Sequence, residues 1–129
     1  MKVKNLKPGC SVVLGRGEVS IDGRYIGNTP KFDLRMSKAG KLRVEFDCDD
    51  ISQENIQMFF TCDAGRVSFK ARNVVGPNID ISIPRVEFKR QWSLKTADNW
   101  MALRFTGKAV AVNGTLLEYT YPTIFQVTQ

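Results

Sequence analysis

Three aspartates that lie close together, Asp47, Asp49 and Asp50, are the first candidates for chemistry in this sequence. Carboxylates at such spacing suit a hard cation, but an EF-hand loop also needs a glycine at its sixth position, and no such pattern is present. The cluster follows an alternating segment and precedes a helix signal, where the helix dipole favours anions. We therefore interpret it as a strand end that leads to a helix N-terminus, and we expect no bound metal or other cofactor.

Catalysis is not expected, because the chain contains no histidine. That absence removes the commonest general base and the commonest zinc ligand, and no serine or cysteine has a visible base partner. The segment 15–17 (GRG) lacks the Gly-Lys-Ser/Thr ending of a phosphate-binding loop, so we interpret it as a hairpin turn. The three cysteines, Cys10, Cys48 and Cys62, have no zinc-site spacing, and their odd number fits a reducing compartment, so we expect them to be small buried apolar residues.

Residues 88–95 (FKRQWSLK) interleave aromatic and basic side chains. Surfaces that bind single-stranded nucleic acid place stacking rings beside cations, and an OB-type barrel is one fold that carries them. Alternatively, Phe88 and Trp92 pack in a core while the cations line a solvated or subunit-facing edge. Both interpretations stay open, and a nucleic-acid-binding module is the alternative to the function inferred below.

Size and charge bound the remaining possibilities. With 129 residues, we expect a single domain over 1–129 with one core. No run of 18 apolar residues is present and the basic N-terminus lacks a signal-peptide stretch, so we expect assembly in a cytoplasm and no membrane partner. The net charge of +6 is spread along the chain, which is compatible with a polyanion partner and also with contacts between subunits.

Alternation with a period of two predicts strands along most of the chain. Apolar residues occupy every second position in 42–48, 67–71, 79–83 and 101–105. After Pro84 the apolar positions change from odd to even, which predicts a bent strand that feeds two sheets, or an edge strand with a bulge at Pro84. Asn113-Gly114 predicts a type I′ turn in a hairpin that joins 106–112 to 115–121.

A single helix is predicted over about 52–61. Ser52 is a good N-cap residue and Glu54 suits the first turn, while Ile51 and Ile56 have the spacing of a hydrophobic staple. We therefore predict a mainly β fold, a β-sandwich or closed barrel with one short helix.

Three segments in order carry a family resemblance. The first is 17–19 (GEV) followed by 24–32 (RYIGNTPKF), which is similar to a strand, a turn and an aromatic-Leu-Gly-Asn-x-Pro-x-Phe block. The second is 50–60 (DISQENIQMFF), similar to an Asn-Ile-Ser-x-Glu-Asn-Leu-x-x-Phe-Phe helix. The third comprises 83–88 (IPRVEF), 92–94 (WSL) and 99–107 (NWMALRFTG), similar to an Ile-Pro-x-Val strand and an Asp-Trp-x-x-Leu-x-Phe-x-Gly strand. Together they resemble the tail tube (major tail) proteins of long-tailed bacteriophages.

This resemblance implies a β-sandwich or barrel subunit that forms rings, usually hexameric, in the virion tail. The rings stack into a tube around a tape-measure protein, terminator and tip proteins are further partners, and DNA passes through as transient cargo. A different ring protein of the tail, such as a terminator or tip component, is a second possibility. The family usually has a long insertion between the first hairpin and the helix, whereas here residues 35–41 join them almost directly.

Edge-strand logic and the resemblance together suggest a set of subunit-interface residues: Tyr25, Lys31, Arg35, Arg85, Lys89, Arg90 and Trp92. A lumen through which DNA slides should not hold phosphate strongly, because each fixed cation adds a salt-dependent contact. We therefore expect most of the surplus positive charge to face neighbouring subunits or the exterior.

Overall fold

A computed structural model describes residues 2–4, 8–71, 79–89, 94–97 and 100–120. One helix, α1 (Gln53–Thr61), accompanies the strands of a mainly β chain. The strands are β1 (Lys2–Lys4), β2 (Ser11–Leu14), β3 (Gly17–Ile21), β4 (Arg24–Thr29), β5 (Phe32–Met36), β6 (Leu42–Cys48), β7 (Ala64–Ala71), β8 (Ile79–Phe88), β9 (Leu94–Ala97), β10 (Trp100–Ala109) and β11 (Glu118–Thr120).

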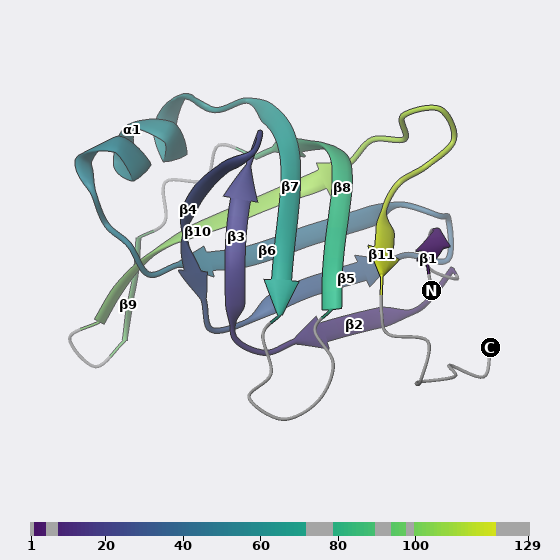
Figure 1. The fold of residues 1–129 in the computed structure, drawn as a ribbon, viewed down its shortest axis with the longest axis horizontal. Helices are drawn as coiled ribbons and strands as arrows, with labels where there is room; N and C mark the ends of the chain where they lie inside the picture. The colour runs from purple at the N-terminus through teal and green to yellow at the C-terminus, as the bar shows by residue number, and fades with distance from the viewer. Residues whose placement is uncertain (1, 5–7, 72–78, 90–93, 98–99, 121–129) are drawn as a thin grey trace.

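The strands form one antiparallel sheet that folds back on itself. Hydrogen bonds link them in the order β2-β5-β6-β10-β8-β7-β3-β4, while β11 pairs with β1 and β8, and β9 pairs with β10. In Figure 1, β2, β5, β6 and β10 run across behind a second layer that contains β3, β7 and β8. The path ends at β2 and β4, which do not pair with each other, so the described strands form a sandwich and not a closed barrel. The mainly β fold with one short helix is confirmed.

Aromatic rings fill the space between the two layers. Phe32 of β5 stacks on Phe69 of β7 with ring centroids 4.5 Å apart, and Phe46 of β6 stacks on Phe105 of β10 at 5.2 Å. The alternation predicted for 42–48 and 67–71 is confirmed by the buried side chains of Leu42, Val44, Phe46, Cys48, Val67, Phe69 and Ala71. Inward-facing apolar residues of both layers therefore form a single core.

A bulge on β8 explains the change of phase at Pro84. Gly65 of β7 lies opposite Val86, and Val67 lies opposite Ile83, so two residues of β8 face only one of β7. Ile83 and Val86 are both fully buried, because the extra residue moves the inward positions from odd to even. The first half of β8 also pairs with β11 and the second half with β10, so the predicted bent strand is confirmed.

The turn predicted at Asn113-Gly114 forms, but the prediction that it joins two paired strands is wrong. Asn113 and Gly114 have φ angles of 52° and 80°, as a type I′ turn requires, and Val112 forms a bridge with Thr115. Strand β10, however, ends at Ala109 and pairs with β6, β8 and β9, whereas β11 pairs with β1 and β8. Both strands find better-buried partners in β8, so tertiary pairing overrides the local hairpin signal.

Helix α1 begins and packs as the sequence predicts. The Ser52 hydroxyl accepts a hydrogen bond from the Asn55 amide at 3.2 Å, and Phe59 packs edge-on against Phe105 with centroids 5.2 Å apart. The described part of the chain contains no helix with the length and apolar character needed to cross a bilayer.

Gly17 provides a test of the packing between β3 and the core. A Cβ atom at Gly17 would lie 2.6 Å from the Phe69 ring and 2.6 Å from the carbonyl oxygen of Lys70. Gly17→Ala should therefore lower the free energy of unfolding by about 1–3 kcal/mol, because the ring and the strand must shift. Gly15→Ala is the matched control in the same turn, since nothing lies within 4 Å of its Cβ position. Urea unfolding measures both, and equal losses would contradict this account.

Candidate interaction surface

The outer face of β5, β6 and β10 carries charged side chains in cross-strand rows. Arg35 of β5 lies opposite Arg43 of β6, which lies opposite Lys108 of β10. In the next row, Asp33 lies opposite Glu45. Directly opposed residues have Cβ atoms only about 4.5–5.5 Å apart, so like charges in one row repel each other. The sheet therefore holds a row of cations beside a row of acids.

The acidic side chains of this face have cations of their own. Lys31 Nζ lies 3.6 Å from Asp33 Oδ2. Arg104 Nε donates to Asp47 Oδ1 at 2.9 Å and lies 3.5 Å from Glu45 Oε1, and the hydrogen bond to Asp47 raises the pKa of the Arg104 guanidinium. The acids of the neighbouring row are thus paired with Lys31 and Arg104, while Lys108 at the end of the cation row lies opposite Glu87 of β8.

A basic hollow of about 380 Å³ opens where the β5–β6 hairpin meets the end of β10. Five exposed cations surround it: Arg35, Lys41, Arg43, Lys89 and Lys108. Met36, Ser37 and Gly107 complete its lining. Among the described residues, no carboxylate forms an ion pair with any of the five cations. We call this surface the basic hollow.

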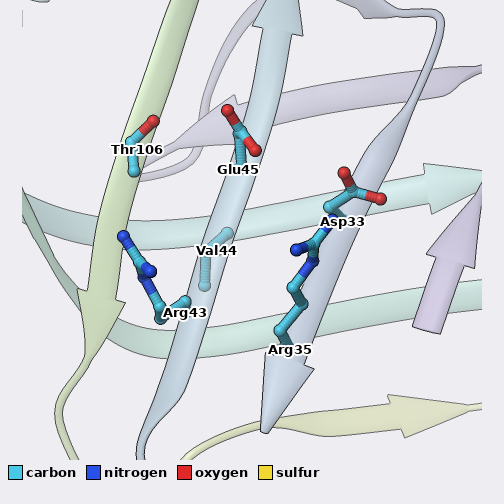
Figure 2. Close-up of a pocket in the computed structure, with 6 residues that line it drawn as sticks. All are labelled: Asp33, Arg35, Arg43, Val44, Glu45 and Thr106. Atoms are coloured by element: carbon cyan, nitrogen blue, oxygen red, sulfur yellow. The ribbon is translucent and has the colours of Figure 1, made fainter. Parts of the chain in front are cut away.

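A mixed hollow of about 170 Å³ adjoins the basic hollow and shares Arg35 and Arg43 with it. Figure 2 shows these two guanidinium groups on the same face as Asp33, Glu45 and Thr106. Asp33 is only 6% exposed, and its Oδ1 atom has no hydrogen-bond partner in the described structure. A buried acceptor without a donor is costly, so a ligand group that combines a donor with a nearby anion would fit this hollow.

The short connection between β5 and β6 places Lys41 beside the hollow. Ser37 N donates to the Lys41 carbonyl at 2.9 Å, and Gly40 N donates to the Ser37 carbonyl at 3.0 Å. The Ser37 hydroxyl also accepts from Lys41 N at 3.0 Å. These bonds close a tight turn at the position where the resembling family carries its insertion, so the cations around it stay uncovered by any such segment.

Strand β2 is an open edge of the sheet. It pairs with β5 along one side, and none of the described strands pairs with its other side. Met36 N donates to the Cys10 carbonyl at 2.8 Å, so the alternation of an antiparallel ladder directs the peptide groups of Ser11 and Val13 away from β5. The Val13 side chain is 57% exposed. None of the described segments pairs with this edge, which begins next to Arg35.

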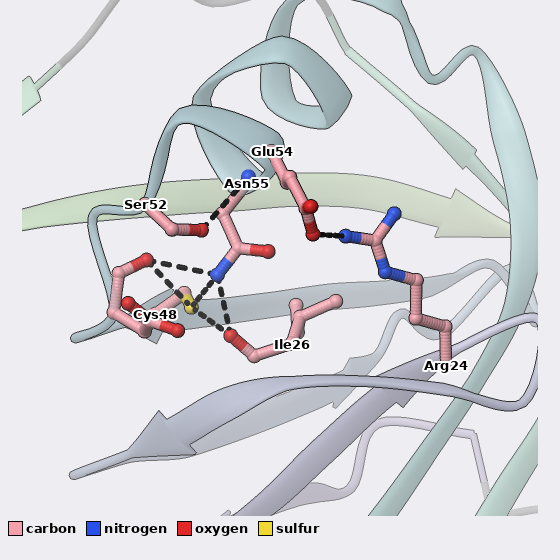
Figure 3. Close-up of polar contacts among 7 residues, drawn as sticks. Arg24, Ile26, Cys48, Ser52, Glu54 and Asn55 are labelled. Carbon is pink, nitrogen blue, oxygen red and sulfur yellow. Dashed lines mark hydrogen bonds and ion pairs between the residues drawn. The ribbon is translucent and has the colours of Figure 1, made fainter.

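Strand β4, at the opposite end of the path, is covered by the segment between β6 and α1 (Figure 3). The buried Asn55 amide donates from Nδ2 to the Ile26 carbonyl at 2.6 Å and to the Asp50 carbonyl at 2.9 Å. Asp49 N donates to the Asn28 carbonyl at 3.1 Å, and Asn28 N donates to Asp49 Oδ1 at 3.2 Å. The Ile26 carbonyl and both backbone polar groups of Asn28 are therefore occupied, so a further strand cannot bond to them.

The acidic cluster 47–50 does not form a metal site in the described structure. Asp47 pairs with Arg104, Asp49 covers β4, and Asp50 is exposed ahead of α1. In the described ranges, no three His, Cys, Asp or Glu side chains group as metal ligands. The interpretation of a strand end leading to a helix is confirmed, since β6 ends at Cys48 and α1 begins at Gln53.

The residues suggested for an interface fall in different places. Arg35 and Lys89 line the basic hollow, and Lys31 pairs with Asp33 beside it. Tyr25 is 55% exposed on β4, and Arg85 is exposed at the β8 bulge. Arg90 and Trp92 lie outside the described residues. The structure thus brings together two members of the set, and their role as an interface stays a prediction.

Three cations of the hollow, Lys41, Arg43 and Lys108, were not suggested by the sequence. Arg43 could have been predicted from the sequence, because a tight turn between two alternating strands places it opposite Arg35. Lys108 could not have been predicted in this way, because its position depends on the pairing of β10 with β6, which are far apart in the sequence.

One of the two aromatic rings that suggested a nucleic-acid-binding surface, that of Phe88, packs against the core. Phe88 is half-buried and packs edge-on against Phe105 with centroids 5.7 Å apart, as the core-packing alternative predicts. None of the described residues that line the basic hollow is aromatic, although stacking on rings is typical of single-strand binding surfaces.

Comparison with protein-family models, with curated proteins and with solved structures finds no match to this chain. The described residues therefore define the class by fold and surface: a mainly β sandwich with β2 paired on one side only, a covered β4 edge and a basic hollow.

The cover on β4 can be tested through Asn55, which is 3% exposed. Asn55→Asp replaces the amide donor with a carboxylate that faces two carbonyl oxygens, so we expect a loss of about 2–4 kcal/mol in the free energy of unfolding. Gln53→Glu makes the same chemical change at an exposed residue in the first turn of α1, where an acid is tolerated. Urea unfolding of both variants checks this, and an Asn55→Asp protein as stable as the control would refute it.

A second test concerns Cys48, whose Sγ donates to the Ile26 carbonyl at 3.2 Å. Burial raises the pKa of the Cys48 thiol from 9.0 to about 11. The protonated thiol stabilises the fold fully below pH 9, and this contribution is lost as the pH rises from 9 to 11, by up to ~1.4 kcal/mol per pH unit.

The measurement is urea unfolding across that pH range for wild type and Cys48→Ser, whose hydroxyl does not titrate there. The expected burial is wrong for Cys10, which is exposed, so Cys10→Ser is the control and should keep the wild-type slope. An alkaline loss of stability that is identical in wild type and Cys48→Ser would contradict the role of Cys48.

Proposed function

We propose that this chain is a structural subunit that assembles with copies of itself into rings, which stack into a bacteriophage tail tube. The observation that carries the proposal is the asymmetry of the two sheet edges: β2 has no partner among the described strands on its outer side, and β4 is covered. An open edge is a template for pairing with a neighbouring chain. Because its other edge is covered, the subunit offers different surfaces to its two neighbours, as head-to-tail contacts in a ring require.

The arrangement of the three resembling segments supports the same proposal. The first forms the β3–β4 hairpin and enters β5, the second leads into α1, and the third contributes to β8 and β10. Asn55 in the second segment holds the Ile26 carbonyl in the first. Segments that share a resemblance thus lie in contact at the covered edge of the sheet.

In this proposal the protein acts in the virion and not as a catalyst. Its partners are other copies of itself, the tape-measure protein, and the proteins that close the tube ends, while DNA passes only as cargo. The cations of the basic hollow then face a neighbouring subunit and not the lumen, which agrees with the need for DNA to slide. A terminator or tip ring protein differs in one observable: its rings do not polymerise.

The proposal predicts that the purified chain forms rings or tubes in negative-stain electron micrographs, and that Val13→Pro abolishes them. Proline removes the outward N–H of Val13 without removing a bond to β5. The variant should therefore stay folded as a monomer, with a free energy of unfolding within about 1 kcal/mol of wild type.

Val13→Thr is the matched control, because it keeps the outward N–H and the β-branched shape but removes the apolar surface. Assembly should survive in this variant. Rings of normal appearance from Val13→Pro would contradict pairing through β2, and a wild-type chain that forms no ring under any salt condition would contradict the proposed function.

A further inference from the structure

We infer that the basic hollow is a binding site for a small oligophosphate anion, whose phosphate oxygens contact Arg35, Lys41 and Arg43. The ligand chemistry is a chain of linked phosphates, either free as inorganic polyphosphate or attached to a nucleoside as its triphosphate group. This inference goes beyond the proposed function and does not depend on assembly, because all the cations that line the hollow belong to one chain. A single subunit should therefore bind the anion.

The cations of the hollow form a line with one further cation on each side. Arg35, Arg43 and Lys108 lie opposite one another on β5, β6 and β10. Neighbouring strands are about 4.8 Å apart, so the line is roughly 10 Å long. Lys41 lies two residues before Arg43, and Lys89 lies two residues beyond the β8 residue that faces Lys108. An elongated anion with several charges can contact such a cluster at more than one point.

One carboxylate lies in the same line, at its end. Glu87 of β8 is exposed and lies opposite Lys108, but it is not one of the residues that line the hollow. Arg35 and Arg43 have no acid opposite them in the described register, and the acids of the next row are held by cations of their own. Most of the positive charge of the hollow is therefore left for a ligand.

The side chains around the hollow are those that bind phosphate. A guanidinium group offers donors in a planar fork that matches phosphate oxygens in pairs, and a lysine adds a compact charge. The Ser37 hydroxyl, which also lines the hollow, accepts a hydrogen bond from Lys41 N at 3.0 Å, and its own hydrogen remains able to donate. A bound anion also reduces the repulsion between like charges on opposed strand residues.

The dimensions of the hollow favour a small ligand. Its volume of about 380 Å³ lies in the range of roughly 300–1,000 Å³ that is typical of small-molecule sites. None of the described lining residues is aromatic, so a nucleobase would find no ring on which to stack. We therefore expect the phosphate chain to provide most of the binding free energy.

Isothermal titration calorimetry of the full chain with sodium tripolyphosphate, orthophosphate and ATP, all without added metal, tests the inference. Tripolyphosphate should saturate one site per chain and bind about tenfold more tightly than orthophosphate, because more phosphate groups reach the cations. Added salt should weaken binding, since exposed charges are screened. Equal affinities for tripolyphosphate and ATP support a free polyphosphate as the ligand, and a higher affinity for ATP supports a nucleotide. Tripolyphosphate that does not saturate a site overturns the inference.

Removal of the two guanidinium groups locates the site. Arg35→Gln with Arg43→Gln should weaken tripolyphosphate binding about tenfold, because two ion contacts are lost. Arg66→Gln with Lys70→Gln is the matched control, since it makes the same change in net charge on exposed residues of β7. It should bind as wild type does, and urea unfolding should show both variants folded. Equal weakening in the two variants would mean a general response to net charge and would overturn the inference.

Removal of the acid at the end of the line should have the opposite effect. Glu87→Gln leaves Lys108 to the ligand and should tighten tripolyphosphate binding about two- to threefold. Glu54→Gln makes the same change in net charge in the first turn of α1, which Figure 1 shows on the side of the molecule opposite the β5–β6 turn. Its effect should be smaller, and equal effects from the two variants would contradict the placement of the ligand.

Two further samples separate the inference from assembly and from nucleic-acid binding. Val13→Pro, which should remain a monomer, should bind tripolyphosphate with wild-type affinity. Binding by assembled rings alone would overturn a site within one chain. A single-stranded oligothymidylate that binds more tightly per phosphate group than tripolyphosphate overturns the inference in favour of a nucleic-acid surface.

Discussion

The stack of Phe32 on Phe69 is the contact on which the rest of the structure depends, because it joins the two layers of the folded sheet. Phe46 extends it to Phe105, so rings from β7, β5, β6 and β10 form one continuous aromatic column. A sheet that folds back on itself needs large side chains at its centre to exclude water and fix the spacing of the layers. Gly17 leaves room for the Phe69 ring, and α1 docks on the far end of the column through Phe59.

The charged outer face is a consequence of this inner one. Strand residues alternate between faces, so burying Phe32 and Leu34 directs Asp33 and Arg35 to the other side of β5. The register that places Phe32 opposite Phe46 also places Arg35 opposite Arg43. The core thus fixes a cation row that is unfavourable by itself, and the free energy gained by packing offsets this repulsion.

The sequence predicts well what short stretches of chain decide. The alternation of 42–48, the Ser52 cap and the phase change at Pro84 each depend on neighbours within a few residues, and each is observed. It predicts poorly what distant strands decide. The turn at Asn113 forms, but its strands separate because β8 offers both of them partners. The same limit applies to the candidate site: Arg35 was suggested, whereas Lys108 reaches the hollow only through a pairing between distant segments.

The short β5–β6 turn and the buried asparagine of α1 have opposite effects on the two ends of the sheet. Asn55 is the buried residue of α1, and its side-chain amide donates a hydrogen bond to the Ile26 carbonyl of β4. A helix held in this way covers a strand edge whose free backbone groups could otherwise pair with another chain. The tight turn at 37–41 has the opposite effect, because it leaves the cations near the open edge uncovered. In the proposed assembly, one covered edge and one uncovered edge make the two ends of the subunit unlike, and only unlike ends produce an array that grows head to tail instead of stopping at a symmetric pair.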